Sequence, residues 1–245
     1  MPTARPTYLK ACVNGARTPD QHPGLPVTPR ELADAAVAAH GAGARAVHLH
    51  PKTADGADSL LPDVVAAAVT AVGHAVPGLP LGVTTGFWAL PDPQQRLRAV
   101  ESWTVLPDFA SVNWHEPGSP ELAQLLLSRG LGVEVGIFHA DAADSWAGSE
   151  IARHCLRVMI ELPSDADTAT ADDLLALVRT AGSPAPVLLH GLDDSCWPLL
   201  RHAGVRGLQT RIGMEDTLLL PDGSSAPSNA ELVAAAVDIL AGITR

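Results

Sequence analysis

The strongest constraint on the fold is a regular alternation of short apolar runs with longer stretches rich in alanine and leucine, which continues along the whole chain. Apolar runs of this length between turn residues are typical of buried β-strands, and the stretches between them have helical periodicity. The expected strands are Leu9–Asn14, Ala46–His50, Leu81–Thr85, Phe109–Trp114, Val133–Phe138, Leu156–Glu161, Val187–His190 and Leu208–Gly213. The expected helices are Thr28–His40, Pro62–Val76, Pro93–Trp103, Pro120–Ser128, Ala142–Arg153, Ala171–Thr180, Trp197–His202 and Ser228–Ile243.

Two of the expected helices begin with a recognisable capping pattern. Thr28 stands before Pro29 and three residues ahead of Glu31, and Ser228 has Glu231 at the same spacing. In a capping box the hydroxyl and the carboxylate satisfy backbone N–H groups at the start of the helix. The pattern therefore predicts where these two helices start.

Strands that alternate with helices in this way form a parallel sheet with crossover helices. A (β/α)8 barrel takes about 250 residues, and this chain has 245 residues with no break in composition. We therefore predict an α/β fold, a single (β/α)8 TIM barrel domain over residues 1–245. The chain has no GxGxxG motif after the first strand and no P-loop motif, so dinucleotide-binding and P-loop folds lack their phosphate-binding loop.

Composition and charge exclude several classes of protein. Hydrophobic residues make up 47% of the chain, which provides a large core and argues against disorder. The net charge of −11 argues against non-specific binding to nucleic acid. The N-terminal segment lacks the apolar stretch of a signal peptide, and no run of about 18 apolar residues suggests a membrane span. Because the three cysteines are far apart and form no CxxC pair, we expect a reducing, cytoplasmic location.

The second expected strand carries a metal-ligand pattern, His48-Leu49-His50-Pro51. Side chains two residues apart in a strand point to the same face, about 6.6 Å apart, so His48 and His50 project together. Pro51 ends the strand and places the pair near its C-terminal end, where barrel active sites lie. Two imidazoles at this spacing can bind one zinc or a similar divalent ion. A pair of hydrogen-bonded core histidines is the alternative.

The last expected strand supplies a third candidate ligand. If its apolar residues face the helices, Arg211, Gly213 and Glu215 point into the barrel. Strand eight lies two places from strand two in a closed barrel, so Glu215 can complete a site of two histidines and one carboxylate with open positions, as in catalytic metal sites. Arg211 and Asp216 would flank the metal. The alternative is a buried ion pair that fills the barrel.

The same alternation directs a set of polar side chains into the barrel. The set is Asn14, His48, His50, Thr84, Asn113, Glu134, Glu161, His190, Arg211 and Glu215. Burying so many polar groups is costly, which favours a functional site over plain packing. For Glu161 and His190, a satisfied polar position in the core is an equally good interpretation.

Eight segments, in the same order along nearly the whole chain, resemble the β-keto acid cleavage enzyme family. They are NGAR (Asn14–Arg17), LPVTPRELA (Leu25–Ala33), GARAVHLHPK (Gly43–Lys52), VTTG (Val83–Gly86), PDFASVN (Pro107–Asn113), VEVG (Val133–Gly136), TRIGMEDTLLLPDG (Thr210–Gly223) and SNAELV (Ser228–Val233). HxHP on the second expected strand together with RxGxED on the eighth is a specific combination, and it makes the resemblance to this family strong.

The resemblance implies a (β/α)8 barrel that assembles as a homotetramer or homodimer and holds one Zn²⁺ per subunit. It implies that His48, His50 and Glu215 are the metal ligands. It also implies an acyltransferase reaction of the retro-Claisen type, in which a β-keto acid and acetyl-CoA give acetoacetate and a new acyl-CoA.

The resemblance further implies catalytic roles for Asp216, Arg211, Glu134 and Thr84. Asp216 would act as general base beside Arg211. Thr84 would hold the substrate carboxylate or an oxyanion by a hydrogen bond. Glu134 would assist proton transfer or orient groups near the metal. The candidates for substrate binding are Asn14, Arg17, Thr85, Asn113 and Glu116.

Two departures from the family pattern bear on the substrate. Arg17 stands where a well-known member has a glutamate, so a neutral or anionic β-keto acid is expected. Few basic residues are available for the phosphates of CoA. A zinc-dependent hydrolase or aldolase-type lyase that does not use CoA therefore remains an alternative, as does a metal-binding barrel without catalytic activity.

Overall fold

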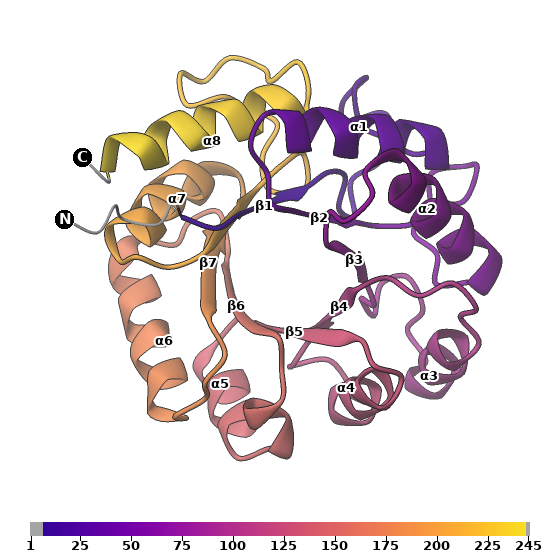
Figure 1. Cartoon of the computed structure of the whole chain (residues 1–245). Coiled ribbons are helices and arrows are strands. Elements are labelled where there is room, and N and C mark those ends of the chain that lie inside the picture. The colour runs from indigo at the N-terminus through magenta and orange to yellow at the C-terminus, as the bar shows by residue number, and fades with distance from the viewer. Residues whose placement is uncertain (1–6, 244–245) are drawn as a thin grey trace.

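The computed structural model describes residues 7–243, which form eight parallel strands surrounded by eight α-helices (Figure 1). The strands are β1 (Leu9–Cys12), β2 (Ala46–Leu49), β3 (Leu81–Thr84), β4 (Phe109–Asn113), β5 (Gly132–Ile137), β6 (Arg157–Leu162), β7 (Val187–Gly191) and β8 (Thr210–Ile212). The helices are α1 (Pro29–Gly41), α2 (Pro62–Ala75), α3 (Pro93–Glu101), α4 (Ser119–Ser128), α5 (Ala140–Ala147), α6 (Thr168–Thr180), α7 (Cys196–Val205) and α8 (Asn229–Ile243), with 3-10 turns η1 (Glu150–Arg153) and η2 (Asp193–Ser195).

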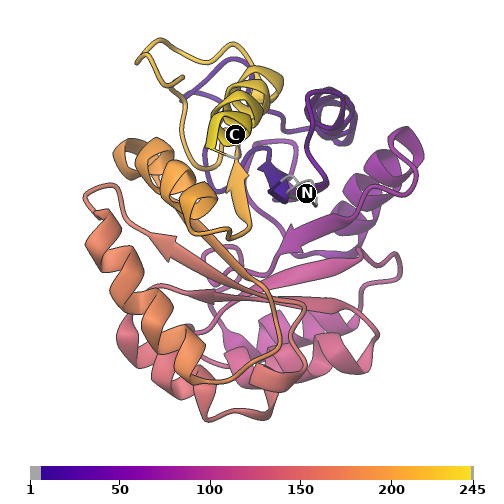
Figure 2. The same ribbon diagram turned by 60° about the vertical axis from the view of Figure 1, so that its left-hand side comes forward.

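The strands are hydrogen-bonded in the order β7-β6-β5-β4-β3-β2-β1-β8. An isolated parallel bridge between Leu188 and Gln209 joins β7 to the chain just before β8. Leu189 N donates to the Gln209 carbonyl at 3.0 Å, and the Thr210 hydroxyl donates to the Leu189 carbonyl at 2.8 Å. These contacts close the sheet, and the predicted (β/α)8 barrel is confirmed. Figure 2 shows the helices outside the strands from a second direction.

The expected helix Ala142–Arg153 is wrong, because the chain forms α5 and the separate turn η1 there. Gly148 ends α5, and the Ser149 hydroxyl donates to the Trp146 carbonyl at 2.7 Å. A serine that bonds to a backbone carbonyl in this way competes with the helical hydrogen bond.

Among residues 7–243, no helix is long and apolar enough to cross a membrane.

The first predicted capping box is confirmed. The Thr28 hydroxyl accepts from Glu31 N at 3.2 Å, and the Glu31 carboxylate accepts from Thr28 N at 2.9 Å. The second differs in detail, since the Ser228 hydroxyl accepts from Ala230 N at 3.1 Å and donates to the Glu231 carboxylate. In both cases the serine or threonine satisfies an N–H group of the first helical turn.

A charged cluster fills the barrel interior toward the N-terminal ends of the strands. Glu134 of β5 forms ion pairs with Lys10 of β1 and Arg157 of β6, and none of the three side chains is more than 6% exposed. The Lys10 ammonium lies 5.7 Å from the centre of the Phe109 ring, and the Arg157 guanidinium lies 4.5 Å from that of Tyr8. These side chains fill the interior of the barrel below its C-terminal end.

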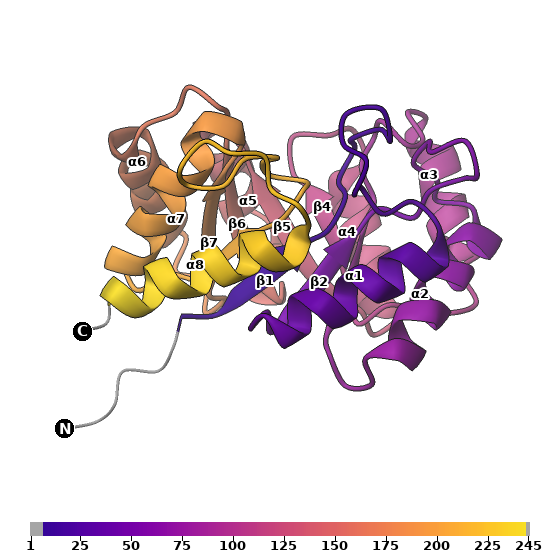
Figure 3. The same ribbon diagram turned by 90° about the horizontal axis from the view of Figure 1, so that it is seen from above.

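At the C-terminal end, the chain after β8 packs directly on the end of β1. Glu215 N donates to the Cys12 carbonyl at 3.1 Å, and Gly213 lies against the same peptide. Gly15 has φ +59°, and a Cβ there would lie 2.4 Å from Glu215 Cγ. These close approaches bring Glu215 over the barrel end. Figure 3 shows that the loops after β1 and β8 rise on the same side of the barrel.

We predict that Gly213→Ala destabilises the fold by about 2 kcal/mol or more, because overpacking against rigid atoms costs about 1–3 kcal/mol. The new Cβ would lie 1.9 Å from the Cys12 carbonyl oxygen, which belongs to the backbone. The free energy of unfolding by urea measures the effect.

The matched control is Gly73→Ala on the exposed side of α2, where a Cβ would meet no atom within 4 Å. Alanine is favoured over glycine inside a helix, so this variant should be as stable as the wild type or more stable. Equal stability of the two variants would contradict the account.

Candidate active site

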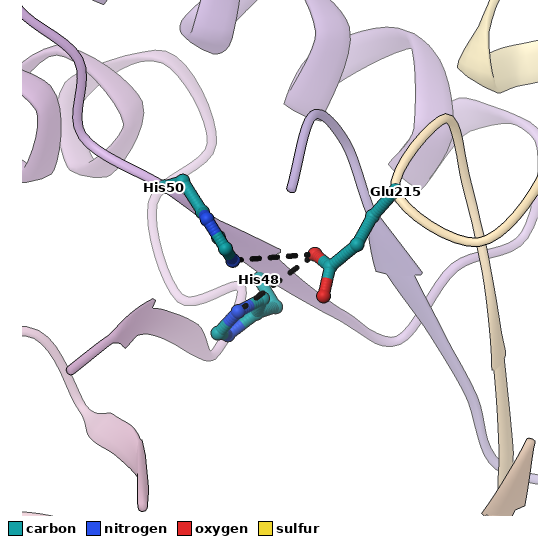
Figure 4. Close-up of side chains that lie close together, drawn as sticks. All are labelled: His48, His50 and Glu215. Carbon is teal, nitrogen blue, oxygen red and sulfur yellow. Dashed lines mark ion pairs between the residues drawn. The ribbon is translucent and has the colours of Figure 1, made fainter. Parts of the chain in front are cut away.

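Three side chains that could hold a metal ion lie together at the C-terminal end of the barrel. His48 Nε2 and His50 Nε2 lie 3.8 Å and 3.7 Å from Glu215 Oε2. One ligand atom from each of the three side chains lies within 4.8 Å of the others. Figure 4 shows both imidazoles turned toward the Glu215 carboxylate.

The strand order explains this meeting. β1 lies between β2 and β8, so the ends of β2 and β8 are two places apart in the barrel. Asn14 holds the end of β2 in place, because its side chain donates to the His50 carbonyl and accepts from His50 N, both at 2.9 Å. The Asn14 amide also donates to the Pro26 carbonyl at 3.2 Å. This side chain is therefore occupied by backbone contacts.

The three side chains fit a metal ion by their chemistry. Glu215 Oε2 is buried and has no hydrogen-bond partner, which is costly for a carboxylate oxygen unless another group completes the site. Burial lowers the pKa of His48, so its imidazole is neutral at pH 7, as a metal ligand must be. Ligand atoms about 2.0–2.1 Å from a tetrahedral zinc lie about 3.3 Å apart. The distances from Glu215 Oε2 to the two imidazole Nε2 atoms, 3.8 and 3.7 Å, are close to this value.

Asp58, from the loop after β2, binds the other nitrogen of His50. Asp58 Oδ2 lies 2.8 Å from His50 Nδ1 and accepts from Trp88 Nε1 at 2.7 Å. Asp58 Oδ1 accepts from Lys52 Nζ. Burial acts to raise the pKa of Asp58, but His50 and Lys52 outweigh it and lower that pKa, so the carboxylate is ionised.

Arg211 holds the two carboxylates that follow β8. Its Nη2 donates to Glu215 Oε1 at 2.9 Å and to Asp216 Oδ1 at 2.7 Å, and its Nε donates to Asp216 Oδ1 at 3.0 Å. Burial would lower the pKa of Arg211, but the neighbouring carboxylates outweigh it and raise that pKa. Asp216 is fully buried, and its Oδ2 has no hydrogen-bond partner.

His190 lies between Asp216 and Glu161. His190 Nδ1 accepts from Arg211 Nε at 3.1 Å and lies 3.4 Å from Asp216 Oδ1, while Nε2 lies 3.2 Å from Glu161 Oε2. Burial acts to raise the pKa of Glu161, but Arg211 and His190 lower it to about 2. Glu161 therefore carries its charge at pH 7.

Two cavities, of about 290 and 370 Å³, open beside the candidate metal ligands. Both are lined by His50, Trp88, Glu161, Arg211 and Glu215. The first is also lined by His48, Thr84, Phe87, Ser111, Asn113, His115, Glu116, Pro117, Phe138 and Met159. The second adds Ala16, Arg17, Gln21, Leu192 and Asp193. Polar residues from β2 and β8 thus meet apolar residues from the loops after β3 and β5.

Thr84, Asn113 and Glu116, three of the residues predicted from the sequence, line the first cavity. Thr84 Oγ1 accepts from Gly86 N at 3.0 Å. Glu116 accepts from Asn113 Nδ2 at 2.8 Å, from Arg96 Nη1 at 2.7 Å and from Phe87 N at 3.0 Å, so it ties together the loops after β3 and β4. We find Thr85 below this surface, where its hydroxyl donates to the Ser111 carbonyl at 2.6 Å.

Of the predicted residues Arg17 and Glu134, only Arg17 lines a cavity. Arg17 lines the second cavity, and its Nη2 donates to Asp193 Oδ1 at 2.6 Å. Glu134 lines neither cavity, and both of its carboxylate oxygens are used by Lys10 and Arg157.

Several residues of the site were not predicted from the sequence. Lys52, Asp58 and Trp88 were not singled out, although Lys52 follows the HxHP motif directly. The apolar residues Phe87 and Phe138 at the first cavity were also not predicted. The available signal was the scarcity of phenylalanine, since of only three in the chain Phe138 ends one predicted strand and Phe87 lies two residues after another.

The fold is a (β/α)8 barrel, and the candidate site lies at the C-terminal ends of the strands, where barrel enzymes have their active sites. Residues 6–245 match the model of the β-keto acid cleavage enzyme family, and the chain belongs to this family.

The chain is similar to two proteins named 3-keto-5-aminohexanoate cleavage enzyme. It is 24% identical over 243 residues to that of Acetoanaerobium sticklandii and 24% identical over 246 residues to that of Fusobacterium nucleatum, and each match covers 92% of this chain and 88% of the relative. A solved structure of ObcA with oxaloacetate shares the fold, with a TM-score of 0.71, 17% identity and 90% of this chain covered. This chain spans 64% of the length of ObcA.

We predict that Glu161 makes stability depend on pH in the acid range. Because its pKa in the folded protein, about 2, lies below the ordinary 4.5, its stabilising contribution is complete above about pH 4.5 and is lost as the pH falls toward 2. The free energy of unfolding of metal-free protein should therefore fall more steeply between pH 5 and 3 in the wild type than in Glu161→Gln. The difference in slope should approach about 1.4 kcal/mol per pH unit. Parallel curves would show that Glu161 is not stabilised by its neighbours.

Proposed function

We propose that this β-keto acid cleavage enzyme is zinc-dependent and transfers acyl groups. In the proposed reaction, R–CO–CH2–COO⁻ and acetyl-CoA give acetoacetate and R–CO–SCoA. The bond between C2 and C3 of the keto acid breaks, the acetyl group joins C2, and the R–CO group passes to the CoA sulfur. The observation that carries the proposal is the juxtaposition of His48, His50 and Glu215 with Arg211 at the cavity wall, where Arg211 also pairs with the buried Asp216.

The three candidate ligands would hold one Zn²⁺ per subunit. A bound zinc would act as a Lewis acid toward the keto and carboxylate oxygens of the substrate. His48 and His50 would supply nitrogen ligands, and Glu215 would supply one oxygen while its other oxygen stays bonded to Arg211. Two histidines and a carboxylate suit several divalent ions, and zinc is proposed because of the family resemblance.

We assign the general base to Asp216. Arg211 neutralises the ionised Asp216 and holds its Oδ1, which leaves Oδ2 as an acceptor for a proton from C2 of the substrate. His190 lies between Asp216 and Glu161, with Nδ1 3.4 Å from Asp216 Oδ1 and Nε2 3.2 Å from Glu161 Oε2, and Glu161 lines the cavity. For Glu134 we propose a supporting role, because it neutralises Lys10 and Arg157 beneath the site.

We assign substrate binding to residues of both cavities. Thr84 would bond to the substrate carboxylate or an oxyanion, and Asn113 would face the same cavity. Asn14, Thr85 and Glu116 would shape this surface through their backbone contacts. Arg17 lines the second cavity with its charge balanced by Asp193, which suits a neutral or anionic β-keto acid.

A hydrolase or aldolase-type lyase that uses no CoA is the second candidate, because basic residues that could bind the CoA phosphates are few. A panel of β-keto acids, incubated with the enzyme with and without acetyl-CoA and followed by mass spectrometry, separates the two. The proposal predicts acetoacetate and a new acyl-CoA in equal amounts, and only when acetyl-CoA is present. Turnover without CoA would support the second candidate.

We also propose that the protein assembles from two or four subunits. The number of subunits can be measured by light scattering.

We predict that His48→Ala removes zinc and activity together, because it deletes one of three protein ligands. Zinc affinity, measured by competition with a chromophoric chelator, should fall by about a hundredfold or more. His74→Ala, on an exposed position near the end of α2, is the control and should bind zinc as the wild type does. Full zinc affinity in His48→Ala would refute the assigned ligand set.

We predict that Asp216→Asn keeps zinc within a few-fold of the wild-type affinity but lowers kcat by about a hundredfold or more, because general-base catalysis contributes on the order of 10²–10⁴. The amide keeps the size of the carboxylate and cannot take the proton. Asp172→Asn on α6 is the control for removing a carboxylate elsewhere. Wild-type turnover in Asp216→Asn would exclude Asp216 as the base.

A further inference from the structure

Asp58 receives three hydrogen bonds that converge behind His50. Its Oδ2 faces His50 Nδ1 at 2.8 Å and Trp88 Nε1 at 2.7 Å, and its Oδ1 accepts from Lys52 Nζ. An ionised carboxylate only accepts hydrogen bonds, so Nδ1 of His50 carries a proton in the form of the imidazole that binds a metal. The lone pair is then on Nε2, which is the nitrogen 3.7 Å from Glu215 Oε2.

Trp88 fixes the plane of the same imidazole. Its ring stacks on the ring of His50, with the centres 5.7 Å apart and the planes 17° from parallel. The indole lies against Gly86, where a Cβ would come within 2.3 Å of the ring. Trp88 thus links the loop after β3 to the end of β2 by stacking and by the hydrogen bond to Asp58.

We infer that Asp58, held by Lys52 and Trp88, is a positioning residue that sets the tautomer and the ring plane of His50 so that Nε2 faces the metal. The inference rests on the proposed metal site. Carboxylates that bind the far nitrogen of a metal-ligating histidine commonly raise metal affinity by about 10- to 100-fold.

The chain contains a matched pair away from the site. Asp172 of α6 lies 2.8 Å from His202 Nε2 through one oxygen and accepts from Arg206 through the other. The pairing is the same as that of Asp58 with a histidine and a cation, but no candidate metal ligand is involved. Asp172→Asn therefore measures what losing such a pair does to the fold alone.

Asp58→Asn tests the inference. An amide in place of Asp58 must turn its NH2 group either toward Lys52 or toward His50 and Trp88, and both orientations set a donor against a donor. Zinc affinity, measured by chelator competition, should fall by about 10- to 100-fold in Asp58→Asn and stay within about twofold in Asp172→Asn. Trp88→Phe keeps a ring over His50 and removes one hydrogen bond, so a loss of about 3- to 10-fold is expected.

The second readout needs neither metal nor activity. In folded, metal-free wild type, ¹H–¹⁵N correlation spectra of the histidine rings should show the proton of His50 on Nδ1. In Asp58→Asn the signals should show a shift toward the Nε2-protonated form. Thermal unfolding of the same samples shows whether the variant is folded. If Asp58→Asn is unfolded, the zinc affinity of Trp88→Phe and the position of the His50 proton in the wild type test the positioning role instead.

The outcomes separate this inference from the proposed function. Unchanged zinc affinity in folded Asp58→Asn, or a wild-type His50 protonated on Nε2, would overturn the positioning role and leave the metal site standing. Equal losses in Asp58→Asn and Asp172→Asn would overturn it as well. Absence of zinc binding to the wild type would overturn the metal site itself, and the inference with it.

Discussion

A buried carboxylate oxygen between two imidazoles is the constraint on which the rest of this site depends. Glu215 Oε2 has no hydrogen-bond partner, and both neighbouring nitrogens are within 3.8 Å. Such an arrangement is unfavourable for a charged group unless a cation completes it. Arg211 satisfies only the other oxygen of Glu215, at 2.9 Å. The arrangement of these side chains therefore favours a cation between Glu215 Oε2 and the two imidazoles.

The buried ion pairs and the cavity-lining carboxylates lie at different heights along the barrel axis. Toward the N-terminal ends of the strands, Glu134 is neutralised by Lys10 and Arg157 and contacts neither cavity. Toward the C-terminal ends, the carboxylates of Glu161 and Glu215 line both cavities. This division agrees with the general rule that barrel enzymes carry stability at one face and reactivity at the other.

Much of the fold and part of the site could be predicted from the sequence. Period-two alternation correctly directed His48, His50 and Arg211 into the barrel, because side-chain direction in a strand is a local property. Closure of the barrel then brought Glu215 to the pair, since β1 alone separates β2 from β8. The family match over residues 6–245 confirms the resemblance seen in the motifs.

The loops could not be predicted in the same way. Asp58 and Trp88 are 30 residues apart in the chain, and their hydrogen bond depends on how two loops fold over His50. The interior direction of Glu134 followed from its strand, but its distance from the cavities depends on its height in the barrel. Alternation predicts which face of the strand a side chain is on and not its height in the barrel, and the expected role of Glu134 near the metal came from the family resemblance.

The most direct test of the central claim is anomalous X-ray diffraction at the zinc edge from crystals of the zinc-loaded protein. The account predicts one strong anomalous peak per subunit, within bonding distance of His48 Nε2, His50 Nε2 and Glu215 Oε2. A peak elsewhere, or none while these three side chains keep their positions, would contradict it.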